Sequence, residues 1–339
     1  MKIKTWFCAG LLTLLAVGTT AQADTKLLFN MFMVPQDPFN TLVMEPWAKD
    51  VAKATEGRVK IEFAPASLAA PQAQMDGVTK GVFDGAYMYH GFLQGRVKLS
   101  QIAHLPFINV NAKGSSIALW RTYEKFFAEA DEYKDVKLLS LFTFPGGPIY
   151  GMHNAIESKA DLEGIKVYSV AGNIAQMLES AGAGVVVAPA ARSYEIISGG
   201  TVDAFAGYPL YSSTAFHTIQ YAKTITDIPG QLSAPSFALF MNKKRWNSIP
   251  KADQEIIMKL SGEAFSARLA AIDELESKLR SDATAESKKF LTAGDDLMGS
   301  FHQYGDKLKQ DWLASAKQAG VDGEAALMMY EKEARANAN

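Results

Sequence analysis

The sequence predicts an α/β protein of two similarly built lobes with a long C-terminal helix. First, the segment 161–211 alternates apolar strand-like runs with helical spacing, which indicates a βαβ unit followed by a further helix and strand. Second, the pattern G-x-x-D occurs at Gly81–Asp84 and at Gly200–Asp203, each time after a short helix and before an apolar strand. Third, residues 252–290 contain few helix breakers, which predicts one long or gently kinked helix able to span both lobes.

Composition and charge indicate a soluble globular protein of about two domains. The chain has 339 residues, of which 48% are hydrophobic and 21% are charged, and its formal net charge is −2. No basic run exceeds Lys243–Arg245, so nothing in the sequence matches the electrostatic footprint of a nucleic-acid-binding protein. We therefore expect no nucleic-acid partner.

Residues 1–23 have the pattern of a signal peptide. Lys2 and Lys4 precede the apolar run 6–17, and Ala21-Gln22-Ala23 is a cleavage site before Asp24, so the mature protein is expected in the periplasm. The apolar run is too short to span a membrane. The single cysteine, Cys8, lies within this peptide and is not placed to anchor a lipid, so we expect no disulfide and no cysteine chemistry in the mature chain.

The N-terminal part begins with a predicted strand, Leu27–Val34, which includes Phe32. Pro35 and Pro38 end this strand and present Gln36 and Asp37 on a loop. The spacing then predicts helices over 39–55 and 73–80 and a strand over 59–63.

The strand after Asp84 delivers Tyr87, Tyr89 and His90 to its carboxyl end. A histidine in such a place is more often a hydrogen-bonded structural residue than a catalyst, and no Ser, Cys or metal-ligand cluster is evident beside it. We expect no metal and no cofactor.

The chain is predicted to cross between the lobes at Pro145-Gly146-Gly147-Pro148. This break follows a strand ending at Phe144, which itself follows a helix over 115–129 and a short strand ending at 105–107, and it precedes Tyr150.

The segment 161–211 predicts where a ligand would bind. Its strands are expected at 165–170, 185–188 and 202–205, with helices over 174–180 and 193–198. Ligands of open parallel sheets bind beyond the carboxyl ends of the strands, where Tyr168, Phe205, Tyr208 and Tyr211 are placed. The alternative is that these aromatic side chains only fill a core.

Strands over 222–226 and 236–242 are expected next, the second returning to the first lobe. The predicted divisions are 1–23 for the signal peptide, 24–148 plus 234–255 for the first lobe, 149–233 for the second, and 256–339 for helices packed across both lobes, mainly on the second.

The order of several motifs resembles a known family. WAKDVAKATEGRVKIEFAPASL, GVFDGAY, LPF, SKADLEGIKV, P-x-x-x-x-Y-E, G-x-V-D and Y-P-L follow one another as in the periplasmic solute-binding subunits of tripartite ATP-independent periplasmic (TRAP) transporters, the DctP type, over residues 24 to about 333. The resemblance implies a two-lobe, type II-like binding-protein fold with hinge strands. It also implies a monomeric receptor, not an enzyme, which closes over a small organic solute and docks on a small and a large membrane subunit.

Three departures from the family pattern bear on the ligand. Relatives have an arginine that grips the solute carboxylate where this chain has Tyr168, a second arginine in some members near Pro148, and an asparagine near Tyr208. A site that exchanges guanidinium for aromatic rings favours an amine, an amino-alcohol such as ethanolamine, or a neutral solute.

Other interpretations stay open. Arg192 could enter the cleft and restore binding of a carboxylate or sulfonate. A periplasmic enzyme would have to use His90, His104, His153 or His217, yet G-x-S-x-G, H-E-x-x-H and phosphate-loop motifs are missing from the sequence. The same fold could also serve a periplasmic sensor or an adhesion module.

The predicted ligand-binding residues are Phe32, Gln36, Asp37, Tyr87, Tyr89, His90, Phe144, Tyr150, Tyr168, Arg192, Phe205, Tyr208 and Tyr211.

Overall fold

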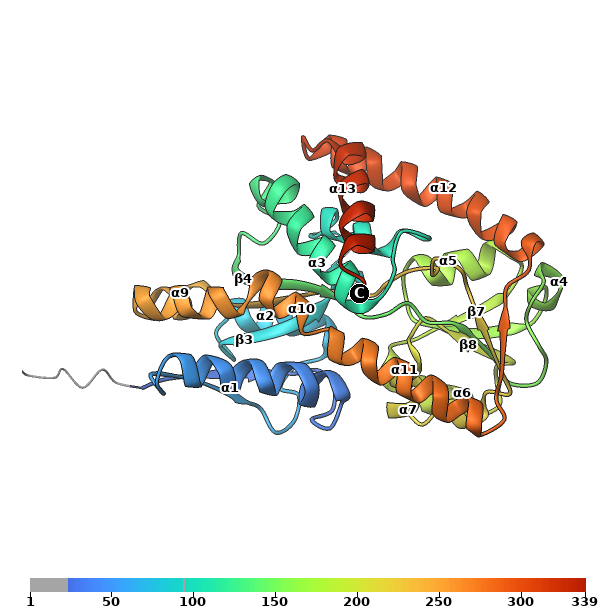
Figure 1. The fold of residues 1–339 in the computed structure, drawn as a ribbon, viewed down its shortest axis with the longest axis horizontal. Coiled ribbons are helices and arrows are strands. Elements are labelled where there is room, and N and C mark those ends of the chain that lie inside the picture. Colours follow the sequence, from blue (N-terminus) through green and yellow to red (C-terminus); the bar gives the residue numbers. More distant parts are fainter. Residues whose placement is uncertain (1–23, 94) are drawn as a thin grey trace, which may run out of the picture.

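The chain folds into two lobes, each built on its own β-sheet (Figure 1). The computed structural model describes residues 24–93 and 95–339, so the predicted signal peptide and Cys8 lie outside the described residues. Lobe I holds a five-stranded sheet of order β2-β1-β3-β10-β4, and lobe II a six-stranded sheet of order β11-β9-β5-β8-β6-β7. The two-lobe α/β fold expected from the sequence is confirmed.

The sheet of lobe I is mixed. Its strands are β1 (Thr25–Asn30), β2 (Val59–Phe63), β3 (Gly85–Tyr89), β4 (Val136–Thr143) and β10 (Ser236–Asn242). Strand β1 pairs in parallel with β2 and β3, whereas β10 lies antiparallel between β3 and β4. The carboxyl ends of β1, β2 and β3 and the beginning of β10 therefore meet at one edge of the sheet.

The helices of lobe I cover both faces of this sheet. They include α1 (Glu45–Ala54), preceded by a π-helical turn Asn40–Met44, α2 (Gln74–Thr79), α3 (Ala112–Thr122) and α8 (Lys243–Asn247). An aromatic core holds them to the strands: Phe39 stacks on Phe142 at 4.8 Å between ring centroids, and Trp47 meets Phe29 edge-on at 5.7 Å. Buried aromatic side chains of this size dominate the energetics of a core.

Lobe II contains the predicted βαβ unit. Its elements in chain order are β5 (Ile149–Gly151), α4 (Lys159–Leu162), β6 (Lys166–Ser169), α5 (Asn173–Ser180), β7 (Gly184–Val187), α6 (Ser193–Ser198), β8 (Ala204–Ala206), α7 (Leu210–Ala215) and β9 (Thr224–Asp227). Strand β6 pairs in parallel with both β7 and β8, so the carboxyl ends of these three strands lie together.

The repeated G-x-x-D pattern forms the same structure in both lobes. Gly81 and Gly200 adopt positive φ values of 74° and 65° after short helices. The carboxylate of Asp84 accepts a hydrogen bond from the backbone N–H of Leu28 at 2.8 Å, and that of Asp203 accepts one from Lys166 at 2.9 Å. Each aspartate thus joins the beginning of one strand to a neighbouring strand, which explains why the motif recurs.

Two backbone segments cross between the sheets side by side. Residues 144–148 lead from β4 to β5, and residues 228–235 lead from β9 back to β10. A Cβ atom on Gly146 would lie 2.6 Å from the carbonyl oxygen of Ser233, so the two crossings approach too closely for a side chain at this position.

The long helix expected over 252–290 is broken into three. The structure has α9 (Lys251–Leu260), α10 (Gly262–Ala267) and α11 (Ala270–Ala285), followed by the short strand β11 (Lys289–Thr292). The first break lies at Gly262, whose φ is 53° and whose missing Cβ leaves room for the ring of Trp120, 2.9 Å from the ideal Cβ position. Close packing against a tryptophan therefore overrides the helical periodicity.

The C-terminal elements lie on both lobes (Figure 1). Helices α9 and α10 pack on lobe I, α11 runs from α3 of lobe I to α7 of lobe II, and β11 extends the sheet of lobe II. Helix α12 (Asp295–Gln318) returns along α5, and α13 (Gly323–Ala336) packs on α3. These helices are thus not placed mainly on the second lobe as expected. The exact residue boundaries of the two lobes stay a prediction.

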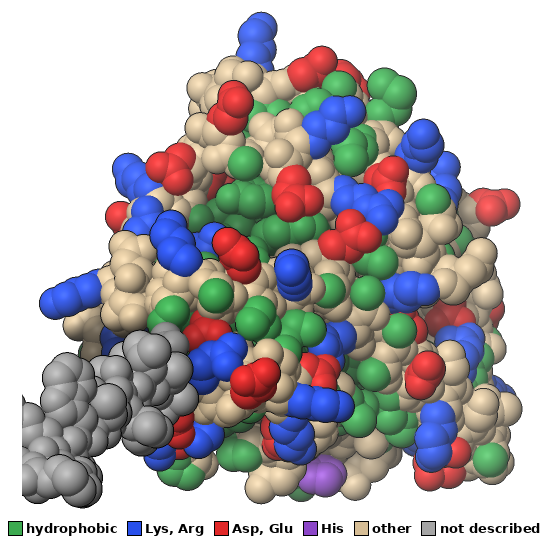
Figure 2. All heavy atoms as spheres, turned by 60° about the vertical axis from the view of Figure 1, so that its left-hand side comes forward, with side chains coloured by type: hydrophobic (Ala, Val, Ile, Leu, Met, Phe, Trp, Pro, Cys, Tyr) green, Lys and Arg blue, Asp and Glu red, His purple; other side chains and the backbone are tan. Residues whose placement is uncertain are grey.

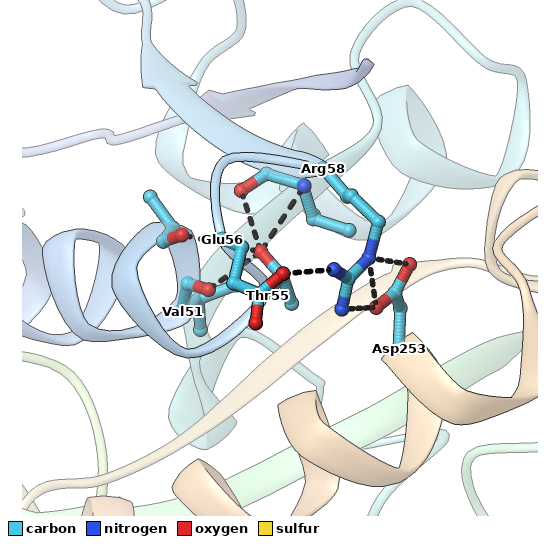
Figure 3. A network of polar contacts seen from close by, with 7 residues as sticks. Val51, Thr55, Glu56, Arg58 and Asp253 are labelled. Atoms are coloured by element: carbon cyan, nitrogen blue, oxygen red, sulfur yellow. Dashed lines mark hydrogen bonds and ion pairs between the residues drawn. The ribbon is translucent and has the colours of Figure 1, made fainter. Parts of the chain in front are cut away.

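An ion pair joins α9 to the first half of lobe I (Figure 3). The guanidinium of Arg58 donates from Nε and Nη2 to Oδ1 of Asp253, at 3.1 and 3.0 Å, and Asp253 is buried. The turn before Arg58 is held by Thr55, whose hydroxyl donates to the carbonyl of Val51 at 2.8 Å and accepts from the N–H of Val59 at 3.1 Å. The ATEGRV run is thus a helix stop that positions an arginine.

Candidate functional site

A cavity of about 370 Å³ lies between the two lobes. Lobe II contributes mainly residues that follow the carboxyl ends of β6, β7 and β8, as expected for parallel strands. These residues, with two from α7 and its end, are Val170, Ala171, Val187, Ala188, Pro189, Ala190, Ala191, Gly207, Tyr208, Pro209, Ser212 and Phe216.

The wall from lobe I is formed at the matching edge of its sheet. It consists of residues after β1 and β2, the end of β3 and the turn after it, the two crossings, and the beginning of β10: Phe32, Met33, Val34, Pro71, Gln72, Tyr89, Phe92, Phe144, Pro235 and Phe237. Phe144 and Phe237 are 4.4 Å apart between ring centroids and are both buried, so this wall is continuous with the core of lobe I.

Direct contacts between the lobes show that the cleft is closed. The hydroxyl of Tyr89 donates a hydrogen bond to the carbonyl oxygen of Ala171 at 3.3 Å. The side-chain amide of Asn173 donates to the carbonyl oxygen of His104 at 3.0 Å. Both bonds join residues after strands of lobe II to lobe I, so separation of the lobes would break them.

The lining described above contains no charged side chain. Its polar side chains are Gln72, Tyr89, Tyr208 and Ser212. Of these, Tyr208 is already bonded, since its hydroxyl donates to Oγ1 of Thr218 at 3.1 Å, and burial raises the pKa of this phenol. The cavity therefore offers aromatic faces, aliphatic surface and few free polar groups.

Of the predicted ligand-binding residues, the structure brings Phe32, Tyr89, Phe144 and Tyr208 to the cavity wall. The others lie behind the wall, in the cores of the lobes, or on the surface, and Gln36 is exposed on its loop.

Tyr168 does not face the cleft as expected. It is fully buried, its ring lies 6.2 Å from that of Tyr208, and its hydroxyl donates to the carbonyl oxygen of Ala188 at 3.1 Å. The residue of this segment that lines the cavity is Val170, the first after β6. Tyr168 therefore supports the wall from behind.

Arg192 does not enter the cavity either. Its side chain is 60% exposed, and Nη2 lies 3.1 Å from Oε1 of Glu195 one turn along α6. The interpretation in which Arg192 restores anion binding is therefore not supported by its position.

His90 belongs to a buried polar network of lobe I. Its Nδ1 lies 2.8 Å from the hydroxyl of Ser236 and its Nε2 lies 2.8 Å from the hydroxyl of Tyr133. Burial, assisted by His104, holds the pKa of His90 well below its usual range, so the ring is neutral. This is the structural role given above as the more frequent one for such a histidine.

The remaining predicted residues are buried side chains. Tyr150 and Phe205 stack at 4.5 Å between centroids within lobe II. Asp37, Tyr87 and Tyr211 lie buried beside the cavity without lining it, and their polar groups are considered below.

Several lining residues were missed by the sequence analysis. Pro71, Gln72, Phe92, Phe237 and the run 187–191 line the cavity, and only the rule on strand ends could have indicated that run. Phe237 was not predicted because it lies within β10, the strand with which the chain re-enters lobe I after lobe II.

Two larger cavities lie away from this cleft. One, of about 600 Å³, is at the hinge, and its three acids are already bonded. Asp273 accepts from the N–H groups of Ala112 and Lys113, and Glu276 from those of Leu210 and Tyr211. Asp227 accepts from the guanidinium of Arg280 at 3.0 Å. The other, of about 650 Å³, lies at the outer edge of the lobe II sheet and has no lining residue from lobe I. Neither brings unsatisfied groups of both lobes together.

The surface in Figure 2 shows basic and acidic side chains interspersed rather than collected into a field of one sign. Within residues 24–93 and 95–339, no helix is both long and apolar enough to cross a membrane.

Comparison with known proteins gives the family. The model of the DctP family, described as bacterial extracellular solute-binding protein family 7, matches residues 29–310. The chain is 48% identical over 338 residues to the outer membrane transporter protein TsaT of Comamonas testosteroni, covering 99% of this chain and 100% of that protein.

Solved structures agree. A TRAP periplasmic solute-binding protein of Bordetella bronchiseptica with bound (R)- and (S)-mandelate is 28% identical, with a TM-score of 0.87 and coverage of 92% of this chain and 99% of that one. A marine metagenome TRAP solute-binding protein specific for aromatic acids, in complex with 3-hydroxybenzoate, is 26% identical, with a TM-score of 0.82 and coverage of 93% and 99%. The chain thus belongs to the DctP family, the periplasmic solute-binding receptors of TRAP transporters.

Proposed function

We propose that this receptor captures a solute that carries no negative charge and has a mainly apolar, ring-sized body, and delivers it to the TRAP membrane subunits. The observation that supports this most directly is the lining of the cleft: none of the lining residues named above carries a charged side chain. A volume of about 370 Å³ falls in the range of ordinary small-molecule sites and suits a ring with a few substituents.

The energetics favour this class over an acid. Apolar surface removed from water contributes about 25 cal/mol per Å². A buried carboxylate without a cation or several donors costs several kcal/mol instead. Aromatic faces such as those of Phe32, Tyr89 and Phe237 attract cations by about 0.5 to 2 kcal/mol, so a protonated amine on an apolar body also fits. An amino-alcohol as small as ethanolamine would leave most of the cavity unfilled.

The second candidate is an aromatic acid. It is favoured by the mandelate and 3-hydroxybenzoate bound in the two solved relatives. Its weakness is that Tyr168 occupies the position of the carboxylate-binding arginine expected from the family pattern, and Arg192 points away.

Four probes of equal ring size separate these functions. Toluene, benzyl alcohol, benzylamine and benzoate are each tested by calorimetry and by thermal shift, because a ligand that binds only the native state raises the melting temperature. We expect binding of toluene, benzyl alcohol and benzylamine and none of benzoate. Binding of benzoate alone would establish the aromatic-acid receptor and contradict our proposal.

The proposed role is binding without chemistry. The bound probe should be recovered unchanged after prolonged incubation with the protein, as judged by chromatography. Formation of a product by the purified protein would contradict a receptor function.

A further inference from the structure

Two buried polar atoms beside the ligand cavity have no partner in the part of the chain that the structure describes. Asp37 is 1% exposed; its Oδ1 accepts a hydrogen bond from the N–H of Phe39 at 2.9 Å, but its Oδ2 accepts none. Tyr211 is fully buried, and its hydroxyl also lacks a partner. Buried polar atoms are nearly always bonded, so each such atom calls for a missing group.

These two side chains belong to one cluster with Tyr87. Burial first, and then the charge on Asp37, raises the pKa of both the Tyr87 and the Tyr211 phenols, which places the three groups within electrostatic reach of one another. The hydroxyl of Tyr87 is occupied, since it donates to Oδ1 of Asn40 at 3.0 Å. The free groups of this Asp37 cluster are therefore Oδ2 of Asp37 and the hydroxyl of Tyr211.

The Asp37 cluster adjoins the cavity wall. The ring of Tyr87 lies 5.1 Å from that of Phe32, and the ring of Tyr211 lies 5.5 Å from that of Phe144, and both phenylalanines line the cavity. The rings of Phe32 and Phe144 thus lie between the cavity and the Asp37 cluster on the side of each tyrosine.

An unpaired buried acceptor is energetically costly. Burial raises the pKa of Asp37 to about 7, and the hydrogen bond from Phe39 offsets this only in part. An acceptor of this kind gains most from a donor brought by a ligand, because a hydrogen bond to a charged or buried group contributes more than one exposed to water.

We propose that Asp37 and Tyr211 form the polar end of the ligand site and accept a hydrogen bond from a hydroxyl or ammonium group on the apolar body of the solute. This inference rests on the proposed function and narrows it to apolar alcohols and amines. Asp37 comes from the loop after β1 of lobe I, and Tyr211 comes from α7 of lobe II. A donor bound between them is therefore held by both lobes and favours the closed state.

The test compares the same four probes on matched variants. Asp37→Asn keeps the oxygen that Phe39 requires and replaces the free acceptor by a donor, and Tyr211→Phe removes the free hydroxyl. Asp253→Asn and Tyr330→Phe are the controls, since both residues are buried, are bonded to Arg58 and Asn109 respectively, and do not line the cavity.

In the unaltered protein, benzyl alcohol and benzylamine should bind about tenfold more tightly than toluene, which corresponds to about 1.4 kcal/mol. Asp37→Asn should remove this advantage and leave toluene within twofold of its original affinity. Tyr211→Phe should lower the affinity for benzyl alcohol severalfold, and the controls should change neither probe.

The outcomes distinguish failure of the role given to Asp37 and Tyr211 from failure of the proposed receptor function. Equal binding of toluene and benzyl alcohol, or equal loss of both in Asp37→Asn, would overturn the role of Asp37 while leaving the apolar receptor intact. Binding of benzoate alone, or of none of the probes, would overturn the proposed function and this inference with it. If Asp37→Asn were to misfold, an unchanged affinity of Tyr211→Phe for benzyl alcohol would still overturn the inference.

Discussion

The two walls of the ligand cavity are built from different materials. The wall of lobe I consists largely of aromatic side chains, among them Phe32, Tyr89 and Phe237, whereas that of lobe II consists largely of alanine, proline and glycine in the segments after three parallel strands. The lobe I rings belong to the core: Phe237 stacks on Phe142 at 5.2 Å between centroids. The shape of the site is thus fixed by the packing of one lobe and closed by the backbone of the other.

The largest effect that tests this difference is on stability. Phe237→Ala removes a buried ring of the lobe I core, so the free energy of unfolding should fall by about 3 to 5 kcal/mol. Phe216→Ala removes a partly exposed ring of the lobe II wall, whose one aromatic neighbour among the described residues is Tyr208, and should cost far less. Urea denaturation measures both, and equal losses would show that the walls do not differ in this way.

The next effect is on binding alone. Ala190→Trp fills space from the lobe II wall, so the affinity for benzyl alcohol should fall by about 100-fold, or about 2.7 kcal/mol, with little change in unfolding. Val187→Trp is the control: Val187 also lines the cavity, but it is 49% exposed, so a larger side chain there can turn to solvent. Calorimetry checks the prediction; unchanged affinity in Ala190→Trp would mean that the ligand lies elsewhere.

A smaller effect is the pH dependence of stability, to which two buried acids contribute: Asp37 of lobe I and Glu276 of α11. Burial raises the pKa of Asp37 and of Glu276 to about 7 each. Between the ordinary carboxyl pKa of about 4 and pH 7, the folded protein holds protons that the unfolded chain has lost, so stability should fall as pH rises through this window.

Neutralising these two acids should change the melting temperature in opposite directions. Asp37→Asn should raise the melting temperature at pH 8, because it removes a buried charge that has an unbonded oxygen. The titratable side chains whose pKa the charge on Asp37 raises are Tyr87 and Tyr211. Glu276→Gln should lower it, because both carboxylate oxygens accept N–H groups of α7. Melting curves from pH 5 to 8 measure this; a stability that rises with pH in the unaltered protein would contradict the raised pKa values.

The smallest effect concerns closure. Tyr89→Phe removes the bond from lobe I to the carbonyl of Ala171, and we expect a loss of about 0.5 to 1.5 kcal/mol in ligand affinity, mainly through faster dissociation. Tyr168→Phe, whose hydroxyl bonds within lobe II, is the matched control. Stopped-flow kinetics with benzyl alcohol would detect the difference. Equal dissociation rates in the two variants would show that the Tyr89 hydrogen bond does not hold the lobes together around the ligand.

The sequence predicted the lobes better than the site. The βαβ unit was evident because β-branched runs and glycine stops are local signals, and strands 59–63 and 236–242 have the predicted bounds. Strand β5 has only three residues, and β11 follows a helix without a break in composition, so neither has enough periodicity to be predicted from the sequence. The short strand predicted to end at 105–107 was wrong, because residues 99–104 before it form a 3₁₀ helix.

The site was only partly predictable because it depends on orientation. Tyr168 was placed on the correct strand, but it packs beneath the wall, and Val170 lines the cavity instead. The replacement of the family arginine by Tyr168 was inferred from the motif pattern and stays a prediction. The unbonded oxygen of Asp37 was not, because its burial depends on contacts with residues far away in the chain.

One turn of α11 sets the mechanics of the hinge. Asp273 holds the first N–H groups of α3 in lobe I, and Glu276 holds those of α7 in lobe II, so a single rigid helix grips both moving bodies by their backbones. If the lobes rotate relative to each other, α11 must bend, or one of the two carboxylates must lose its hydrogen bonds to the backbone. Substitutions at these two positions should therefore change how far the lobes can separate.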